Sequence, residues 1–248
     1  MIPVKSLLTG LLLCCSLFAA AADLHLYAGA GLRAPVDEII ARFEKETGHR
    51  VTVEYGGSGQ ILTRVQLTRR GDLFLPGSAD YVDKLSAEGL VSAAFPLVLH
   101  TPVMAVRKDK AAGITTFAQL AESQLKLGMG DPKAIALGKS GEKLLALTGY
   151  GESLREKVVV RTATIKQLVV YLLNGDVDAA VIGRTDAVNN SDTLVILPTP
   201  AGTPQEIATL ALLQSSQHPE EARLLADYFA AAPAIKVFTD RGYLPVSK

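Results

Sequence analysis

The chain has 248 residues, and its 25 lysines and arginines balance its 25 aspartates and glutamates. A chain without net charge has no general attraction to nucleic acid or to an anionic membrane surface, so both are excluded as main partners. With 48% hydrophobic residues, the length suffices for one large domain or for two lobes with separate cores.

The first segment of the chain has the pattern of a secretory signal peptide. Lys5 is the only charge in residues 1–22, and residues 20–22 fit an A-x-A cleavage site. This segment is too short to be a membrane span, so we expect it to be removed when the protein is secreted to the periplasm. Both cysteines, Cys14 and Cys15, lie inside it. The mature chain would then have no disulfide, no cysteine-ligated metal and no cysteine nucleophile.

Strands and helices are predicted to alternate in the next part of the chain. Apolar residues at helical spacing, such as Val36, Ile39, Ile40 and Phe43, predict amphipathic helices between short apolar strands. The predicted strands are 24–28, 51–55 and 72–75, and the predicted helices are 35–47, 59–67 and 78–87. This order implies parallel strands with helices on the faces of the sheet.

A long extended run at 96–106, interrupted by Pro102, is predicted to cross into a second set of strands and helices. The predicted strands there are 125–129, 158–161 and 179–182, with helices 138–148 and 164–173. The return crossing is predicted at 193–197, and the chain closes with strand 207–213 and helices 219–230 and 234–239.

We therefore predict an α/β protein of two lobes, each a mixed sheet flanked by helices, joined by two extended crossings. The first lobe is predicted to comprise 23–98 plus 200–248, and the second lobe 99–199.

Two glycine-rich turns each lie between a predicted strand and a predicted helix. They are residues 28–31, Ala-Gly-Ala-Gly, and residues 56–59, Gly-Gly-Ser-Gly. Such a turn exposes backbone N–H groups at a helix N-terminus, and its small side chains let a ligand approach them. Two of them in one chain predict a cleft for a small oxyanion. Ser58 either donates its hydroxyl to a bound oxygen or serves as the N-cap of its helix.

Other candidates have both a structural and a functional interpretation. Arg33 either extends into solvent or reaches over an anion, although a cation at a helix start opposes the helix dipole. The pairs Leu137-Gly138 and Thr164-Ile165 open predicted helices, either as ordinary caps or as donors from the second lobe. Arg184 follows a strand end, and Asp186 is predicted to be a local cap or ion-pair partner rather than a catalytic acid.

Little in the sequence indicates catalysis or a bound metal. The four histidines, His25, His49, His100 and His218, have no metal-ligand spacing and are predicted to be structural. Ser58 lacks the complete G-x-S-x-G pattern because Gln60 occupies the last position. No cofactor, resident metal ion or enzymatic activity is therefore predicted.

Six segments, in their order and spacing, make the chain resemble a known family. They read AGAGL at 28–32, YGGSGQ at 55–60, RGDLF at 70–74, GMGDP at 128–132, GDVDAAV at 175–181 and TDA at 185–187. These segments resemble those of the periplasmic molybdate-binding proteins of ABC importers, which have the type II solute-binding fold. The resemblance covers nearly the whole mature chain.

The resemblance implies that a tetrahedral oxyanion, with molybdate or tungstate as the leading ligands, is held between the lobes by uncharged donors. It also implies a monomer that closes on the anion and docks on a membrane permease. Gly31 stands where the family has a serine and Gly183 where it has a tyrosine, so we expect Arg33 or Arg184 to substitute for the missing hydroxyls. The predicted binding residues are Ala30, Gly31, Arg33, Ser58, Gly59, Leu137, Gly138, Ile165 and Arg184.

Two other functions stay open at this point. One is a periplasmic sensor that binds another oxyanion, such as sulfate, phosphate or arsenate, and signals to a membrane partner. The other is a hydrolase, for which no activated nucleophile stands out.

Overall fold

A computed structural model describes residues 21–246. The predicted signal peptide, apart from its last two residues, lies outside the described residues. Within residues 21–246, no helix has the length and apolar character that a membrane crossing requires.

The first of two sheets is mixed and has six strands in the order β11-β4-β10-β3-β1-β2. Strands β2, β1 and β3 pair in parallel, and β10, β4 and β11 add antiparallel pairs. The strands are β1 (Asp23–Gly29), β2 (Arg50–Gly56), β3 (Leu73–Leu75), β4 (Val91–His100), β10 (Glu206–Leu213) and β11 (Leu244–Pro245).

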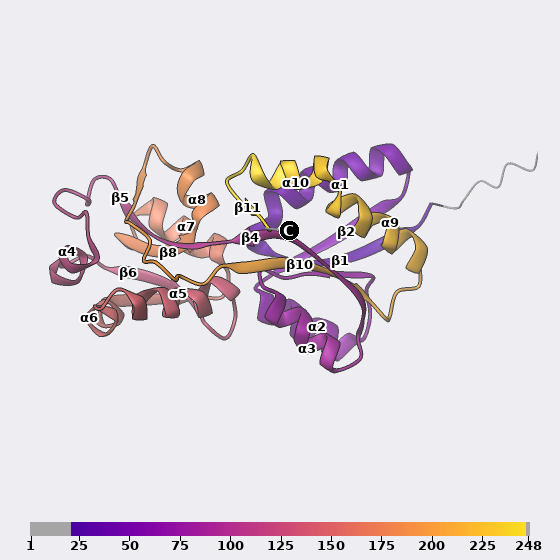
Figure 1. The fold of residues 1–248 in the computed structure, drawn as a ribbon, viewed down its shortest axis with the longest axis horizontal. Helices are drawn as coiled ribbons and strands as arrows, with labels where there is room; N and C mark the ends of the chain where they lie inside the picture. The colour runs from indigo at the N-terminus through magenta and orange to yellow at the C-terminus, as the bar shows by residue number, and fades with distance from the viewer. Residues whose placement is uncertain (1–20, 247–248) are drawn as a thin grey trace, which may run out of the picture.

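Helices cover both faces of this sheet (Figure 1). One face carries α1 (Arg33–Thr47), α9 (Pro219–Ala230) and α10 (Ala232–Thr239), and the other carries α2 (Ser58–Thr68) and α3 (Ala79–Ala87). The apolar side of α1 is fully buried at Phe43, which packs in one core with Phe229 and Phe238. Helix α1 ends at Gly48, whose φ of 78° suits a residue without a side chain. We call these helices and the six strands the six-stranded half.

The second sheet is also mixed and has the order β7-β6-β8-β5-β9. Its strands are β5 (Pro102–Arg107), β6 (Leu127–Gly130), β7 (Val158–Thr162), β8 (Ala179–Gly183) and β9 (Leu194–Ile196). Its helices are α4 (Phe117–Glu122), α5 (Ala136–Leu147), α6 (Gly151–Glu156), α7 (Ile165–Asn174) and α8 (Arg184–Asn189). Two apolar clusters fill the faces of this sheet. We call this part the five-stranded half.

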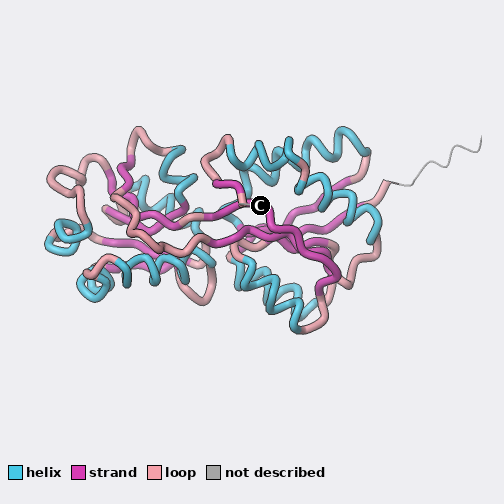
Figure 2. The backbone as a smooth tube through the Cα atoms, viewed as in Figure 1, coloured by secondary structure: helices cyan, strands magenta, loops and turns pink. Residues whose placement is uncertain are grey.

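The two halves lie side by side along the long axis of the molecule and are joined by extended chain (Figures 1 and 2). The outward connection breaks at Thr101, between β4 and β5, whereas the sequence had suggested Pro102. Pro102 instead begins β5 opposite Gly183. The predicted return crossing at 193–197 is wrong, because 194–196 forms strand β9 against β5. The return runs through the following residues to β10, and the lobe boundaries stay a prediction.

The predicted α/β architecture with two mixed sheets flanked by helices is confirmed, and the long helices lie within a few residues of their predicted positions. The longest strand, β4, begins at Val91, before the predicted extended run at 96–106, and that run is divided between β4 and β5. The elements that we did not predict are short: α4, α6 and α8 have six residues each, the 3₁₀ turn η1 (Ala30–Leu32) has three, and β11 has two. A helix of fewer than two turns is too short to show the 3.6-residue period of apolar residues. Hydrophobic periodicity therefore does not predict such short helices.

Candidate functional site

A small cavity of about 20 Å³ lies where the two halves meet. Its lining comes from both glycine-rich turns and from the starts of two helices in the five-stranded half. The lining residues are Gly29–Leu32, Gly56–Ser58, Gly77 and His100 from the first half, and Ile135–Leu137, Thr164 and Ile165 from the second. No residue of this lining, all of which the structure describes, is a lysine, arginine, aspartate or glutamate.

Four helical segments begin at the cavity. They are the 3₁₀ turn η1 (Ala30–Leu32) that leads into α1, and helices α2, α5 and α7. The N–H groups of a first helical turn have no partner within their own helix, and the helix dipole adds a partial positive charge there. The cavity is therefore surrounded by neutral hydrogen-bond donors from both halves.

Ser58 is the first residue of α2, and Gly57 occupies the N-cap position, so the interpretation of Ser58 as the N-cap is wrong. The Ser58 side chain is buried, and its Oγ accepts a hydrogen bond of 3.1 Å from the Gly77 N–H. The Gly57 N–H donates instead to the Gln60 side chain at 2.9 Å. Because the Ser58 oxygen already accepts from Gly77, its own proton is free to donate to another group at the cavity.

Glycines let the two halves approach each other closely here. A Cβ on Gly57 would lie 2.3 Å from the Ala163 carbonyl oxygen across the interface. A Cβ on Gly31 would lie 2.8 Å from Cγ2 of Ile165. Any side chain at position 31, serine included, would therefore collide with Ile165 in this arrangement.

Five of the nine predicted binding residues, Ala30, Gly31, Ser58, Leu137 and Ile165, line the cavity. Gly59 and Gly138 do not. The Gly59 N–H donates to the Ala134 carbonyl at 2.8 Å, so it joins the two halves and is not available to a ligand.

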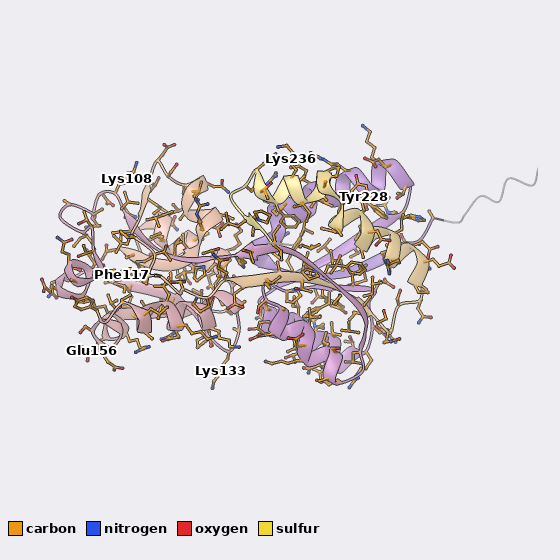
Figure 3. All side chains as sticks on the ribbon, viewed as in Figure 1. Lys108, Phe117, Lys133, Glu156, Tyr228 and Lys236 are labelled. Atoms are coloured by element: carbon orange, nitrogen blue, oxygen red, sulfur yellow. The ribbon has the colours of Figure 1, made fainter. Side chains whose placement is uncertain are left out.

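Gly138 lies behind the cavity in the first turn of α5. Its N–H donates to the Ile135 carbonyl at 3.1 Å, and a Cβ there would lie 2.6 Å from the Asp131 carbonyl oxygen. The loop that contains Lys133 lies at the lower edge of the contact between the halves (Figure 3).

Neither predicted arginine lines the cavity, so the expectation that one of them faces it is not met. The Arg33 guanidinium lies 3.9 Å above the Tyr55 ring, and the Tyr55 hydroxyl bonds to Asp37 at 2.5 Å. This stacking holds the solvent-exposed Arg33 side chain on Tyr55, outside the lining of the cavity. The Arg184 Nη1 donates to the Gly242 carbonyl at 3.3 Å, a contact between the two halves.

His100 is the functional candidate that sequence reasoning missed. It is the last residue of β4, is only 4% exposed, and lines the cavity. Neither ring nitrogen forms a well-aligned hydrogen bond to a described residue, and the Gly77 backbone is the polar group beside the ring that favours its charged form. Burial lowers the pKa of His100 to about 4, against the opposing influence of the Asp186 charge, so the ring is neutral near pH 7. Its position inside the predicted extended run at 96–106, directly after the apolar residues 95–99, is the signal that could have identified it.

Asp186 lies behind His100, on helix α8, and is 6% exposed. One oxygen, Oδ1, pairs with the Lys166 ammonium at 2.6 Å, as the predicted ion-pair role requires, while Oδ2 has no partner in the described structure. The position that a Cβ on Gly183 would take is 3.1 Å from His100 Nε2 and 3.5 Å from Asp186 Oδ2. The two unpartnered atoms therefore border the same small space.

The cavity thus combines backbone N–H groups, one hydroxyl and one neutral imidazole. Within the described residues, no cluster of three or more histidine, cysteine, aspartate or glutamate side chains could hold a metal cation. Neutral donors at helix N-termini suit an anion.

Comparison with known proteins gives a family for the chain. The family model for bacterial extracellular solute-binding proteins matches residues 24–244. A Haemophilus influenzae protein described only as a binding protein is 57% identical over 225 residues, which are 91% of this chain and 92% of the relative. A Bacillus subtilis protein described as an ABC transporter substrate-binding lipoprotein is 28% identical, covering 89% of this chain and 85% of the relative. The molybdate-binding protein ModA of Azotobacter vinelandii is 24% identical, covering 97% and 96%.

Solved structures share the fold. The periplasmic molybdate-binding protein of Azotobacter vinelandii superposes with a TM-score of 0.80 at 14% identity, covering 90% of this chain and all of that one. The sulfate-binding protein SubI of Mycobacterium tuberculosis superposes with a TM-score of 0.81 at 18% identity, covering 91% and 88%. At these identities the likeness establishes the two-lobed type II fold and leaves the ligand open. The family match spans almost the whole described chain, and the chain belongs to the bacterial extracellular solute-binding proteins.

Proposed function

We propose that this protein captures a tetrahedral oxyanion, with molybdate or tungstate as the first candidates, and delivers it to an ABC permease in the membrane. The observation that carries the proposal is the convergence of four helical N-termini on one small cavity whose lining carries no lysine or arginine.

The proposed donors are the N–H groups of Ala30, Gly31, Ser58, Leu137 and Ile165, together with the Ser58 hydroxyl. Removing a dianion from water is costly unless each of its oxygens receives hydrogen bonds. Donors from all sides of the cavity meet this requirement without a counter-charge among the lining side chains. Hydrogen bonds to an ionised group are also stronger than neutral ones.

The size of the cavity supports a small ligand. A single water molecule needs a cavity of about 10–15 Å³. A space of about 20 Å³ excludes ligands beyond a few non-hydrogen atoms while the halves stay closed. Glycines 31 and 57 keep the walls this close, so the spacing between the halves would select for the oxygen-to-oxygen distance of the anion.

Binding would proceed by closure. In an open form, the anion would first meet the turns that contain Gly31 and Ser58. The starts of α5 and α7 would then close over it as the chain bends at the two connections, near Thr101 and near Pro198. The closed form would be recognised by the permease, as the resemblance to ABC transporter binding proteins suggests.

The test is a thermal-shift and calorimetric panel of molybdate, tungstate, sulfate, phosphate, arsenate and chromate on the mature protein. An anion present at 100 times its Kd should stabilise the protein by about 2.7 kcal/mol. A thermal shift with sulfate, phosphate, arsenate or chromate, and none with molybdate or tungstate, would contradict molybdate and tungstate as the ligands. It would leave oxyanion binding standing. No shift with any of the six would overturn the proposed function.

A further inference from the structure

We propose that His100 is itself a ligand of the bound anion and takes up one proton when the anion binds, with Asp186 stabilising the charged imidazole from behind. This inference rests on the proposed oxyanion function and adds a residue and a proton to it.

The position of the ring supports a bridging role. A Cβ on Gly77 would lie 3.2 Å from His100 Nδ1, and the Gly77 N–H bonds to Ser58 Oγ, so this edge of the ring lies at the Ser58 end of the cavity. The opposite nitrogen, Nε2, lies near Gly183 and Asp186. The imidazole therefore extends from the cavity toward a buried carboxylate.

The chemistry of the ring explains the proton. A neutral imidazole has one N–H donor and one acceptor nitrogen, whereas an imidazolium has two donors. In this structure Nε2 and Asp186 Oδ2 border the same space without a hydrogen bond between them. In the proposed complex, the anion on one side and this Asp186 oxygen on the other would both accept hydrogen bonds. Only the protonated ring donates to both. The proton comes from solvent and bonds to the acceptor nitrogen, while the anion keeps its charge and no other bond changes.

The charged groups around His100 favour this change once the anion is present. Asp186 on α8 stabilises the imidazolium, and Lys166 on α7 opposes it but is itself paired with the other Asp186 oxygen. Tyr243 lies 5.7 Å away, ring centre to ring centre, and burial raises its pKa, so it stays neutral. From β10, the buried Glu206 stands opposite His100 in the strand register, and it is not among the groups that shift the pKa of His100. From α2, Ser58 contributes no charge. The anion adds negative charge on the cavity side, where little solvent screens it.

The consequence is a pH dependence with a defined sign. The free ring has a low pKa, about 4, and the anion raises the pKa in the complex. Between these two values, binding consumes one proton, so affinity falls about tenfold for each unit of rising pH. Above the pKa in the complex, this dependence ends.

The test is isothermal titration calorimetry of the mature protein with molybdate, tungstate and sulfate at pH 6.0 to 7.5, in buffers of different ionisation enthalpy. These anions stay fully deprotonated there, so proton uptake reports on the protein. The wild type should take up close to one proton per anion. His100→Gln should take up none, lose the pH slope and bind roughly tenfold or more weakly at pH 6. Asp186→Asn should still bind and take up markedly less than one proton.

His218→Gln serves as the matched control, because His218 precedes α9 and does not line the cavity. It should keep wild-type affinity and proton uptake, and thermal melting should show that all variants are folded. Anion binding without proton uptake by the wild type, or unchanged affinity and pH slope in His100→Gln, would overturn the role of His100 and leave the proposed function standing. Failure of all three anions to bind the wild type would instead overturn molybdate and tungstate as ligands, and the role of His100 with them.

Discussion

Ser58 combines a structural hydrogen bond with the proposed contact to the ligand. Its oxygen accepts from the Gly77 N–H and thereby ties the second glycine-rich turn to the loop after β3. Its proton is left to donate at the cavity. The hydrogen bond from Gly77 therefore orients the Ser58 hydroxyl within the six-stranded half, without a ligand.

Ser58→Ala is expected to weaken anion binding about ten- to a hundredfold, since a hydrogen bond to a charged group contributes about 1.5–3 kcal/mol. It also leaves the buried Gly77 N–H without its partner, at a cost of about 1–3 kcal/mol of stability. Calorimetry and thermal melting measure the two effects. Ser78→Ala is the control, because Ser78 caps α3 and does not itself line the cavity. Wild-type affinity in Ser58→Ala would show that its hydroxyl has only the structural role.

Arg33 is expected to be dispensable for the ligand. Its guanidinium stacks on Tyr55, and it does not line the cavity. Arg33→Gln should keep the order of preference among the six oxyanions, with each affinity within about twofold, which corresponds to a few tenths of a kcal/mol. A changed order of preference in competition titrations would show that the side chain reaches the ligand.

At the scale of the elements, the glycine-rich turns act through close approach as much as through their N–H groups. The start of α2 and Ala163, two residues before α7, come together because position 57 has no side chain. The starts of α2, α5 and α7 can then share one cavity. The donor geometry depends on three helices that are far apart in the chain.

Gly57→Ala should prevent full closure, because its Cβ would lie 2.3 Å from a backbone oxygen that cannot rotate away. If closure is populated less than one part in a hundred, affinity falls by about a hundredfold or more. Small-angle scattering should show no compaction on adding molybdate. Gly89→Ala is the control: it has φ of 71° and open space around it, so about 1 kcal/mol of backbone strain is expected without loss of affinity. Normal compaction and affinity in Gly57→Ala would contradict this account.

At the scale of the whole molecule, few polar contacts join the two halves in this structure. Besides the Gly59–Ala134 and Arg184–Gly242 hydrogen bonds, the described residues form an ion pair between Lys139 on α5 and Asp80 on α3. Lys139 lowers the pKa of Asp80, mainly through their hydrogen bond. Both side chains are about half exposed, so solvent screens the pair.

The Lys139–Asp80 pair is expected to favour closure only modestly. In a double-mutant cycle with Lys139→Gln and Asp80→Asn, the coupling energy on anion affinity should be about 0.2–1 kcal/mol at pH 7 and low salt. Because the pKa of Asp80 is lowered in the folded protein, the coupling is complete above the ordinary value of 3.8 and disappears as the pH falls through the lowered pKa. The Arg223–Asp227 pair, which lies within α9, should show no coupling to affinity. If both pairs showed equal coupling to affinity, the Lys139–Asp80 pair would have no specific role in closure.

The amino-acid sequence by itself determined the order of long strands and helices and the two turns that expose N–H groups. Both depend on neighbours within a few residues. The spacing of apolar side chains determines which face of a helix is apolar, and glycines determine where the backbone N–H groups are accessible. This is why Ser58, Leu137 and Ile165 could be named as candidates from local pattern. Each of these three residues was expected at the start of a helix because of its place in the sequence pattern.

Only the tertiary structure decided which candidates share the cavity and which side chain had been missed. Arg33 lies beside the first turn in the chain, yet stacking on Tyr55 directs it away, and Gly59 uses its N–H to join the halves. His100 became a candidate because Gly31, Gly77 and Gly183, from three separate segments, surround its ring. The burial of His100 and the influence of the Asp186 charge on it both arise from contacts between residues far apart in the chain. Local sequence spacing does not specify the direction of a side chain or its loss of water, because packing between distant segments sets both.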